Sequence, residues 1–268
     1  MQKITLTTLN KMKQSGEKIT CLTAYDASFS YQLAEAGVDI ILVGDSLGMV
    51  VQGEQSTVPV TMDDMAYHTQ LVAKGNEKAE RQAFVIADMP YMSYSTVEDA
   101  LLNAKQLMQA GGQMVKVEGG QWLCESILAL TERGIPVCGH LGLTPQSVDA
   151  LGGYKVQGRD QQAAIKIKQD VAALVKAGIR MLVLECVPTE LAAEISQSVD
   201  IPVIGIGAGP KTDAQVLVIY DMLGISPRFY AKFVKNFMQQ ADDIPSAIKA
   251  YVDEVKNGTF PGEEHSFS

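Results

Sequence analysis

A repeated order of helix, glycine and short apolar strand constrains the fold of this chain more than any other feature. Left-handed glycines often close helices, and buried parallel strands are short apolar runs rich in β-branched residues. The expected strands lie at residues 19–23, 40–43, 83–87, 114–118, 135–138, 179–184 and 201–206, and the pattern at 214–222 does not separate helix from strand. About eight such alternations predict a closed (β/α)8 TIM barrel. A doubly wound open sheet is the alternative, but no glycine-rich dinucleotide turn follows the first strand.

The length of the chain suits one such barrel. With 268 residues and 47% hydrophobic composition, it can bury a large core, so we expect a single catalytic domain over residues 1–268. The residues from Thr7 to Lys13 predict a short opening helix with Leu9 and Met12 on one face. We expect this helix to cover one end of the barrel.

Charge and hydrophobicity argue against several partners. A formal net charge of -9 and a pI near 4.9 leave no basic surface of the kind that nucleic acid or anionic membranes require. No apolar run is long enough to cross a bilayer, and the first five residues lack the apolar core of a secretory signal. We therefore expect a cytoplasmic protein that binds neither nucleic acid nor membrane.

The four cysteines, Cys21, Cys124, Cys138 and Cys186, show no Cys-x-x-Cys spacing and lie in or beside apolar stretches. This pattern is typical of packing residues. Cys186 follows Glu185, so a thiol nucleophile is the alternative, but no histidine lies nearby in sequence to activate it.

Carboxylates recur where the expected strands end. In a parallel barrel, all strand C-termini lie on one face, so these side chains converge there. Four acids mark such positions: Asp45, Asp88, Glu118 and Glu185. A divalent cation would relieve their mutual repulsion, and an all-oxygen set suits Mg²⁺. Ion pairs that satisfy one another are the alternative for any one of these residues.

Alternation along one strand places a cation beside these acids. Lys116 and Glu118 share one face of the strand, while Val115 and Val117 take the other. The valines would face the helices, so Lys116 and Glu118 would point into the barrel. There Lys116 is well placed to hold a substrate carboxylate.

Two further residues are candidates for substrate chemistry. Glu185 follows an apolar strand, and a carboxyl in apolar surroundings suits a proton-transferring base, although a ligand role has the same spacing. His140 lies just past the expected fifth strand, where it would bind substrate, orient a ligand or serve as a supporting structural residue. His68 lies on an expected helix and is interpreted as structural.

Three other segments have two interpretations each. The glycine-rich stretch at 152–159, with Tyr154 and two cations, fits a mobile lid or an ordinary solvated loop. The glycines at 205–209 fit a phosphate site or a tight turn. The tail at 260–267 is aromatic for a loose end, so we expect it to dock on a neighbouring surface.

Long motifs in order resemble the ketopantoate hydroxymethyltransferase family, and the match spans nearly the whole chain to its Pro261–Phe267 tail. The motifs are Val43-Gly44-Asp45-Ser46-Leu47-Gly48-Met49, Pro59-Val60-Thr61, Ala87-Asp88-Met89-Pro90, Val115-Lys116-Val117-Glu118-Gly119-Gly120, Gly139-His140-Leu141-Gly142-Leu143-Thr144-Pro145-Gln146 and Leu184-Glu185-Cys186-Val187-Pro188. One region departs from the family pattern: Tyr220 stands where a histidine often precedes the aspartate, and 227–230 replaces a turn with more glycine and histidine. This departure puts polar roles at that rim, including folate contacts, in doubt.

The resemblance implies a site and a reaction. Asp45, Asp88 and Glu118 would be associated with Mg²⁺, and Ser46 and Lys116 would hold a 2-oxo acid. Glu185 would take the C3 proton of 3-methyl-2-oxobutanoate, and the Mg²⁺-stabilised enolate would attack a one-carbon unit from 5,10-methylenetetrahydrofolate. The product would be 2-dehydropantoate, in pantothenate synthesis. The resemblance also implies a cytoplasmic homodecamer.

Two rival interpretations use the same residues. Another Mg²⁺-dependent, enolate-forming barrel enzyme, of the phosphoenolpyruvate mutase or isocitrate lyase type, would share the architecture and the acids. It would ordinarily carry a cysteine-containing lyase signature, which this sequence lacks. A non-catalytic oligomeric barrel would keep its acids only as ion pairs.

Overall fold

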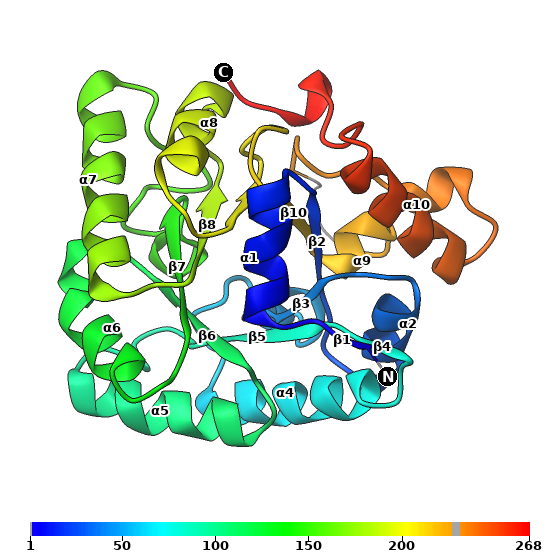
Figure 1. Ribbon diagram of the computed structural model, residues 1–268, viewed down its shortest axis with the longest axis horizontal. Helices are drawn as coiled ribbons and strands as arrows, with labels where there is room; N and C mark the ends of the chain where they lie inside the picture. The colour runs from blue at the N-terminus through cyan, green and yellow to red at the C-terminus, as the bar shows by residue number, and fades with distance from the viewer. Residues whose placement is uncertain (1, 227–230) are drawn as a thin grey trace.

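The computed structural model describes residues 2–226 and 231–268, and its centre is a closed barrel of eight parallel strands (Figure 1). Around the barrel, β10 lies between β9 and β2, and the other strands follow in sequence order. The strands are β2 (Ile19–Thr23), β3 (Ile40–Val43), β5 (Phe84–Asp88), β6 (Met114–Glu118), β7 (Val137–Gly142), β8 (Met181–Glu185), β9 (Val203–Ile206) and β10 (Ala214–Leu217). Two short strands, β1 (Gln2–Lys3) and β4 (Arg81–Gln82), pair outside the barrel. The predicted TIM barrel is confirmed.

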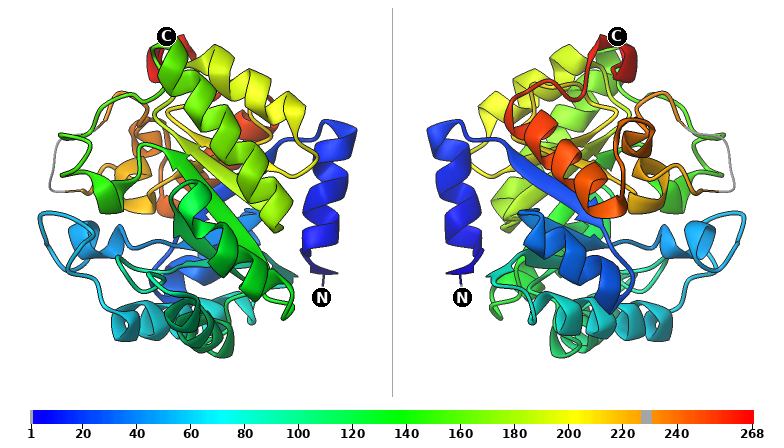
Figure 2. Two further views of the ribbon diagram at one scale, coloured as in Figure 1. Left: turned by 90° about the vertical axis from the view of Figure 1, so that its left-hand side faces the viewer. Right: turned by 90° about the vertical axis from the view of Figure 1, so that its right-hand side faces the viewer.

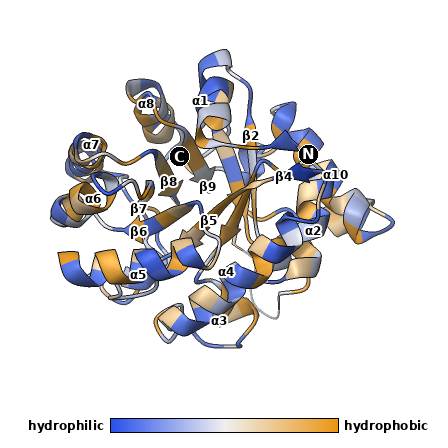
Figure 3. Cartoon of the chain, turned by 60° about the horizontal axis from the view of Figure 1, so that its bottom comes forward, coloured by the Kyte–Doolittle hydropathy of each residue, from blue (hydrophilic) through white to orange (hydrophobic). Residues whose placement is uncertain are grey.

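Helices alternate with the strands and surround the barrel. They are α1 (Leu6–Ser15), α2 (Ala27–Glu35), α3 (Leu47–Val50), α4 (Met62–Asn76), α5 (Val97–Gln109), α6 (Cys124–Thr131), α7 (Gln161–Ala177), α8 (Thr189–Ser198), α9 (Ile219–Met222) and α10 (Ile244–Lys256). Hydrophilic and hydrophobic segments alternate along these helices, whereas the strands at the centre are mainly hydrophobic (Figure 3). This pattern is expected where each helix buries one stripe against the sheet. Among the described residues, no helix has the length and hydrophobicity that a membrane span requires.

Local capping fixes where the longer helices begin. The side chains of Thr61, Thr96 and Asp160 each accept a hydrogen bond from a backbone N–H in the first turn of α4, α5 and α7. Such caps satisfy donors that have no partner within the helix. At the other end of α7, Gly178 adopts φ 110°, a left-handed conformation that lets the chain turn into β8.

Helix α1 covers one end of the barrel, as the sequence predicts. Its cap is Thr5, and its apolar residues Leu9 and Met12 are buried against the inward-facing side chains of the strands. Figure 2 shows α1 on one side of the barrel and the loops after β3 and β7 on the opposite side. The end that holds the strand C-termini is therefore left for the site.

The barrel interior changes character along its axis. Near α1 it is filled by apolar side chains such as Ile19, Phe84 and Met181, whereas at the strand C-termini it becomes charged. Lys116 and Glu118 face this charged end, while Val115 and Val117 pack outward against the helices, as predicted. The period-2 alternation of a strand accounts for this division.

Two sequence-based boundaries require correction or completion. Strand β7 extends to Gly142, so His140 lies within the strand and not past it, because residues 137–140 pair with β6 and residues 138–142 pair with β8. The undivided segment at 214–222 separates into β10 and α9. The unusual turn at 227–230 lies outside the described residues.

Candidate active site

A cavity of about 610 Å³ opens at the C-terminal ends of the strands. Its inner end is polar, and all seven predicted site residues line the cavity: Asp45, Ser46, Asp88, Lys116, Glu118, His140 and Glu185. The structure thus brings the whole predicted set together. Its remaining wall is mainly apolar and is built from loops and from the end of the chain.

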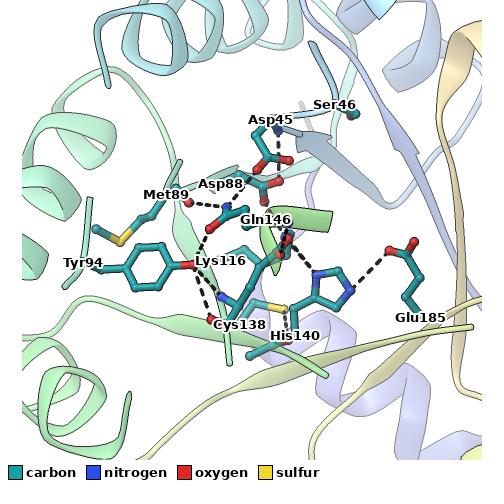
Figure 4. Close-up of polar contacts among 12 residues, drawn as sticks. Asp45, Ser46, Asp88, Met89, Tyr94, Lys116, Cys138, His140, Gln146 and Glu185 are labelled. Atoms are coloured by element: carbon teal, nitrogen blue, oxygen red, sulfur yellow. Dashed lines mark hydrogen bonds and ion pairs between the residues drawn. The ribbon is translucent and has the colours of Figure 1, made fainter. Parts of the chain in front are cut away.

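Lys116 is the electrostatic centre of the polar end (Figure 4). Its Nζ lies 3.2 Å from Asp88 Oδ1 and 3.1 Å from Glu118 Oε1, and all three side chains are nearly inaccessible to solvent. Strand register creates this arrangement, because Asp88 pairs with Lys116 and Glu118 pairs with His140 on neighbouring strands. Parallel register therefore converts residues that are distant in sequence into a compact charged group.

Burial disfavours the charged form of every side chain in this group, and the neighbouring charges decide the direction in which each pKa shifts. Despite burial, the adjacent carboxylates raise the pKa of Lys116 well above its usual value. Despite burial, Lys116 and His140 lower the pKa of Glu118 to about 2. Asp45 has the opposite balance, since burial together with Asp88 and Glu118 raises its pKa well above the ordinary range. The site is therefore short of positive charge near Asp45.

His140 connects this group to Glu185. Its Nδ1 lies 3.1 Å from Glu118 Oε1, and its Nε2 lies 3.3 Å from Glu185 Oε2. Burial lowers the pKa of His140, but its carboxylate neighbours raise it overall to about 9, so the imidazole is protonated at neutral pH. Protonated Nδ1 donates to Glu118, while Nε2 forms an ion pair with Glu185 without a hydrogen bond, so His140 attracts both carboxylates. Of its three predicted roles, the structure shows this supporting contact.

Glu185 differs from the other acids in its access to the cavity. Its side chain is 12% exposed, against 1% for Glu118, and it lies at the end of β8. Gly142 on β7 passes so close that a Cβ there would lie 2.2 Å from the Glu185 carbonyl oxygen. Only glycine fits that approach at φ 90°, and it keeps Glu185 at the cavity edge.

Gln146 is a site residue to which sequence reasoning gave no role. Its Nε2 donates to Asp45 Oδ2 at 2.8 Å, and its backbone N–H donates to Glu118 Oε2 at 3.1 Å. The hydroxyl of Tyr94 donates to Gln146 Oε1 at 2.5 Å and fixes the amide orientation. The Thr-Pro-Gln end of the fifth motif contained Gln146, but its partner Asp45 lies 101 residues away in sequence.

The predicted metal set of Asp45, Asp88 and Glu118 stays a prediction. Among residues 2–226 and 231–268, no three His, Cys, Asp or Glu side chains form a group that could hold a metal ion by themselves. Both oxygens of Glu118 already accept from Lys116, His140 and Gln146. Asp88 Oδ1, in contrast, is buried and accepts no hydrogen bond from a described residue, although Lys116 Nζ is nearby. Asp45 and Asp88 are thus the pair with capacity for a cation.

The loops complete the cavity wall. Tyr154 and Val156 of the glycine-rich 152–159 stretch line the cavity, which supports a covering position but leaves a lid motion as a prediction. The turn at 205–209 is tightly packed: a Cβ at Gly209 would lie 2.5 Å from the Thr189 side chain. The tail docks as expected, and its Phe267 reaches the cavity.

Several predicted supporting residues have identifiable contacts. His68 Nδ1 lies 2.6 Å from the carbonyl oxygen of Tyr25, whose hydroxyl is 2.9 Å from Ser46 Oγ, so His68 is structural as expected. Tyr220, which replaces a histidine of the family pattern, packs its ring 5.7 Å from that of Tyr25. The replacement therefore serves packing beside the site.

Cys186 is buried at the cavity wall and has a strained backbone. Its φ of 47° is left-handed, which is uncommon for a residue with a Cβ. Burial raises the pKa of its thiol, with Glu185 adding to the effect, so the thiol form dominates at neutral pH. This environment disfavours the nucleophile interpretation.

A parallel (β/α)8 barrel with buried acids, one cation and one accessible carboxylate at its C-terminal end belongs to the class of barrel enzymes. Comparison with known proteins defines the family. The model of the ketopantoate hydroxymethyltransferase family matches residues 3–263. The chain therefore belongs to the ketopantoate hydroxymethyltransferase family and is an enzyme of the transferase class.

Full-length relatives support this assignment. A 3-methyl-2-oxobutanoate hydroxymethyltransferase of Pseudoalteromonas atlantica is 60% identical over 268 residues, which cover 100% of each chain. The enzyme of the same name from Pseudomonas fluorescens is 60% identical over 269 residues, again with 100% coverage. A non-catalytic barrel is inconsistent with this membership.

Solved structures resemble the chain in fold alone. A putative phosphonomutase from Burkholderia cenocepacia has a TM-score of 0.65 at 13% identity and covers 82% of this chain and 94% of its own. A 2,3-dimethylmalate lyase of the phosphoenolpyruvate mutase/isocitrate lyase superfamily has a TM-score of 0.57 at 15% identity, with 96% and 98% covered. Enzymes of the rival lyase type thus share the barrel architecture with this chain, whereas the family that matches its sequence is ketopantoate hydroxymethyltransferase.

Removing the central cation should unfold the site. We expect Lys116→Met to lower the free energy of unfolding by about 3–5 kcal/mol, because Asp88 and Glu118 stay buried without their partner. Denaturant unfolding measures this, with Lys105→Met on the exposed face of α5 as the matched control, expected to stay within about 0.5 kcal/mol. Equal stability of the two variants would show that Lys116 does not hold the acids together.

Proposed function

We propose that this enzyme transfers a hydroxymethyl group from 5,10-methylenetetrahydrofolate to 3-methyl-2-oxobutanoate, giving 2-dehydropantoate for pantothenate and coenzyme A biosynthesis. Family membership gives the reaction class. The observation that carries the mechanism is the placement of a less buried acid, Glu185, in the same cavity as a buried group of acids around Lys116. The geometry separates charge stabilisation from proton transfer.

The acid group fits a bound divalent cation. Asp45 and Asp88 are buried side by side, with the Asp45 backbone N–H donating to Asp88 Oδ2 at 3.1 Å, and Asp88 Oδ1 has no hydrogen-bond donor among the described residues. Hard oxygen ligands of this kind suit Mg²⁺. Asp45 and Asp88 would hold the ion, and Glu118 would complete the anionic set. When bound, Mg²⁺ supplies Lewis-acid stabilisation of the charge on the substrate keto oxygen.

The other polar residues bind the 2-oxo acid. Lys116 supplies positive charge for the substrate carboxylate at the inner end of the cavity. The Ser46 hydroxyl lines the same end and is oriented by Tyr25, so it can donate to the substrate. His140 positions Glu185 and adds a second positive charge beside the substrate. These contacts would fix the acid with its C3 hydrogen toward Glu185.

Glu185 takes the C3 proton, which leaves the electron pair on the substrate as an enolate. The C3 carbon then bonds to the methylene carbon of the folate as one of its two carbon–nitrogen bonds breaks. Water breaks the second carbon–nitrogen bond and supplies the hydroxyl group. The proton taken from C3 and one proton of the water end on the two folate nitrogens. Tetrahydrofolate leaves. Because Glu185 and the buried acid group line one cavity, a single bound oxo acid can contact both.

Removal of the base should stop proton transfer. We expect Glu185→Gln to slow exchange of the C3 hydrogen with deuterated water by about 10²–10⁴-fold, while 3-methyl-2-oxobutanoate still binds. Proton NMR of the substrate measures the exchange rate. Glu190→Gln, an exposed glutamate on α8, is the control and should exchange like the unsubstituted enzyme. Undiminished exchange in Glu185→Gln would remove Glu185 as the base.

Metal binding gives an independent test. We expect calorimetry to detect Mg²⁺ binding in the presence of 3-methyl-2-oxobutanoate, and Asp45→Asn or Asp88→Asn to weaken it by at least about 10-fold. Asp63→Asn on the exposed face of α4 is the matched control. Binding of the oxo acid that is indifferent to Mg²⁺ in the unsubstituted enzyme would contradict the metal assignment.

We extend the proposal to the organisation of the protein: a single catalytic domain over residues 1–268, assembled as a cytoplasmic homodecamer. Three consecutive helices, α5, α6 and α7, each leave a large aliphatic side chain exposed: Leu102, Leu128 and Ile165. Exposed apolar side chains of this kind are common at subunit interfaces. Light scattering should give a mass ten times that of the 28.9 kDa chain, and a monomeric mass would contradict this.

A further inference from the structure

The apolar side of the cavity includes two aromatic rings from separate parts of the chain. Phe233 follows the 227–230 turn, and Phe267 is the penultimate residue; both line the cavity. We call these two residues the aromatic wall. Figure 1 shows the C-terminal segment passing beside the start of α8. Neither ring has a part in the reaction steps described above.

The aromatic wall is held in place by specific contacts. The backbone N–H and hydroxyl of Thr189 each donate to the carbonyl oxygen of Phe267 at 3.0 Å. Lys232 Nζ donates to the Ser266 carbonyl oxygen at 2.5 Å. The two Thr189 bonds fix the last turn of a tail that would otherwise fray.

The turn after β9 is shaped to admit both rings. A Cβ at Gly207 would lie 2.8 Å from Phe233 and 3.0 Å from Phe267, and Gly207 adopts φ 58°. The preceding residue, Ile206, pairs in register with Glu185. The aromatic wall therefore lies next to the end of the strand that pairs with Glu185.

A positive charge, that of Lys232, lies beside the aromatic wall. Lys232 is exposed, and its Nζ lies 5.3 Å from the centre of the Phe267 ring. A planar ligand on the wall would thus meet both aromatic rings and a cation. This combination suits a flat heterocycle that carries an anionic tail.

We propose that the aromatic wall is the subsite for the planar pterin ring of the folate donor, with Lys232 directed to its anionic tail. This assignment rests on the proposed function. It accounts for the size of the cavity, which at about 610 Å³ has room for more than a five-carbon acid. It also places the folate on the side of Glu185 that is opposite the acid group.

Substitutions at the wall should separate the two substrates. We expect Phe267→Leu to weaken tetrahydrofolate binding roughly 3- to 10-fold, because it keeps apolar volume but removes the ring, whereas Phe267→Tyr stays near the unsubstituted value. Fluorescence titration measures the affinity. Exchange of the C3 hydrogen of 3-methyl-2-oxobutanoate, measured without folate, should be unchanged in both variants.

Substitution of Lys232 gives a second test of the subsite, which compares the affinities of two ligands. We expect Lys232→Met to weaken tetrahydrofolate by about 2- to 5-fold and to leave 6-methyltetrahydropterin, which lacks the anionic tail, unaffected. Phe267→Leu should weaken both compounds.

The outcomes distinguish the subsite from the reaction. Unchanged tetrahydrofolate affinity in Phe267→Leu, with normal turnover of the unsubstituted enzyme, would overturn the subsite alone. Loss of C3 exchange in Phe267→Leu would also overturn it, because the ring would then shape the oxo acid site. Failure of the unsubstituted enzyme to bind tetrahydrofolate would overturn both the subsite and the proposed function.

Discussion

The ion pairs of Lys116 with Asp88 and Glu118 are the interaction on which the rest of the site depends. Each of these charges is buried, so each would be costly alone, and the group is stable only because register on adjacent strands holds its members about 3 Å apart. Asp45 adds a further acid that the cation does not fully balance. The barrel thus holds an anionic excess that the protein itself leaves open to ligands.

The two ends of the barrel have different roles: one stabilises the fold, and the other holds the candidate active site. At the end under α1, Leu9 and Met12 close an interior of apolar side chains, which supplies hydrophobic stabilisation without polar cost. At the other end, the interior is charged and the loops are long. Concentrating the unfavourable buried charges at one end leaves the rest of the core free to offset them.

Connections across the site come from distant segments. Gln146 joins Asp45 to Glu118 by hydrogen bonds, while His140 bonds Glu118 and pairs electrostatically with Glu185, so the acid group and the proposed base form one connected polar unit. A change at either connecting residue is transmitted to both carboxylates it contacts. The tail adds Phe267 to the cavity wall from the far end of the chain.

Sequence alone determined seven of the eight barrel strands, the helix that covers the barrel, and the acids that meet at one rim, because strand alternation and parallel topology are local or general rules. It also determined that Lys116 and Glu118 face inward. Only the tertiary structure decided that His140 lies within β7 between two carboxylates, that Gln146 contacts Asp45, and that Phe267 reaches the cavity. These contacts join residues far apart in the chain, and no local pattern encodes such partners.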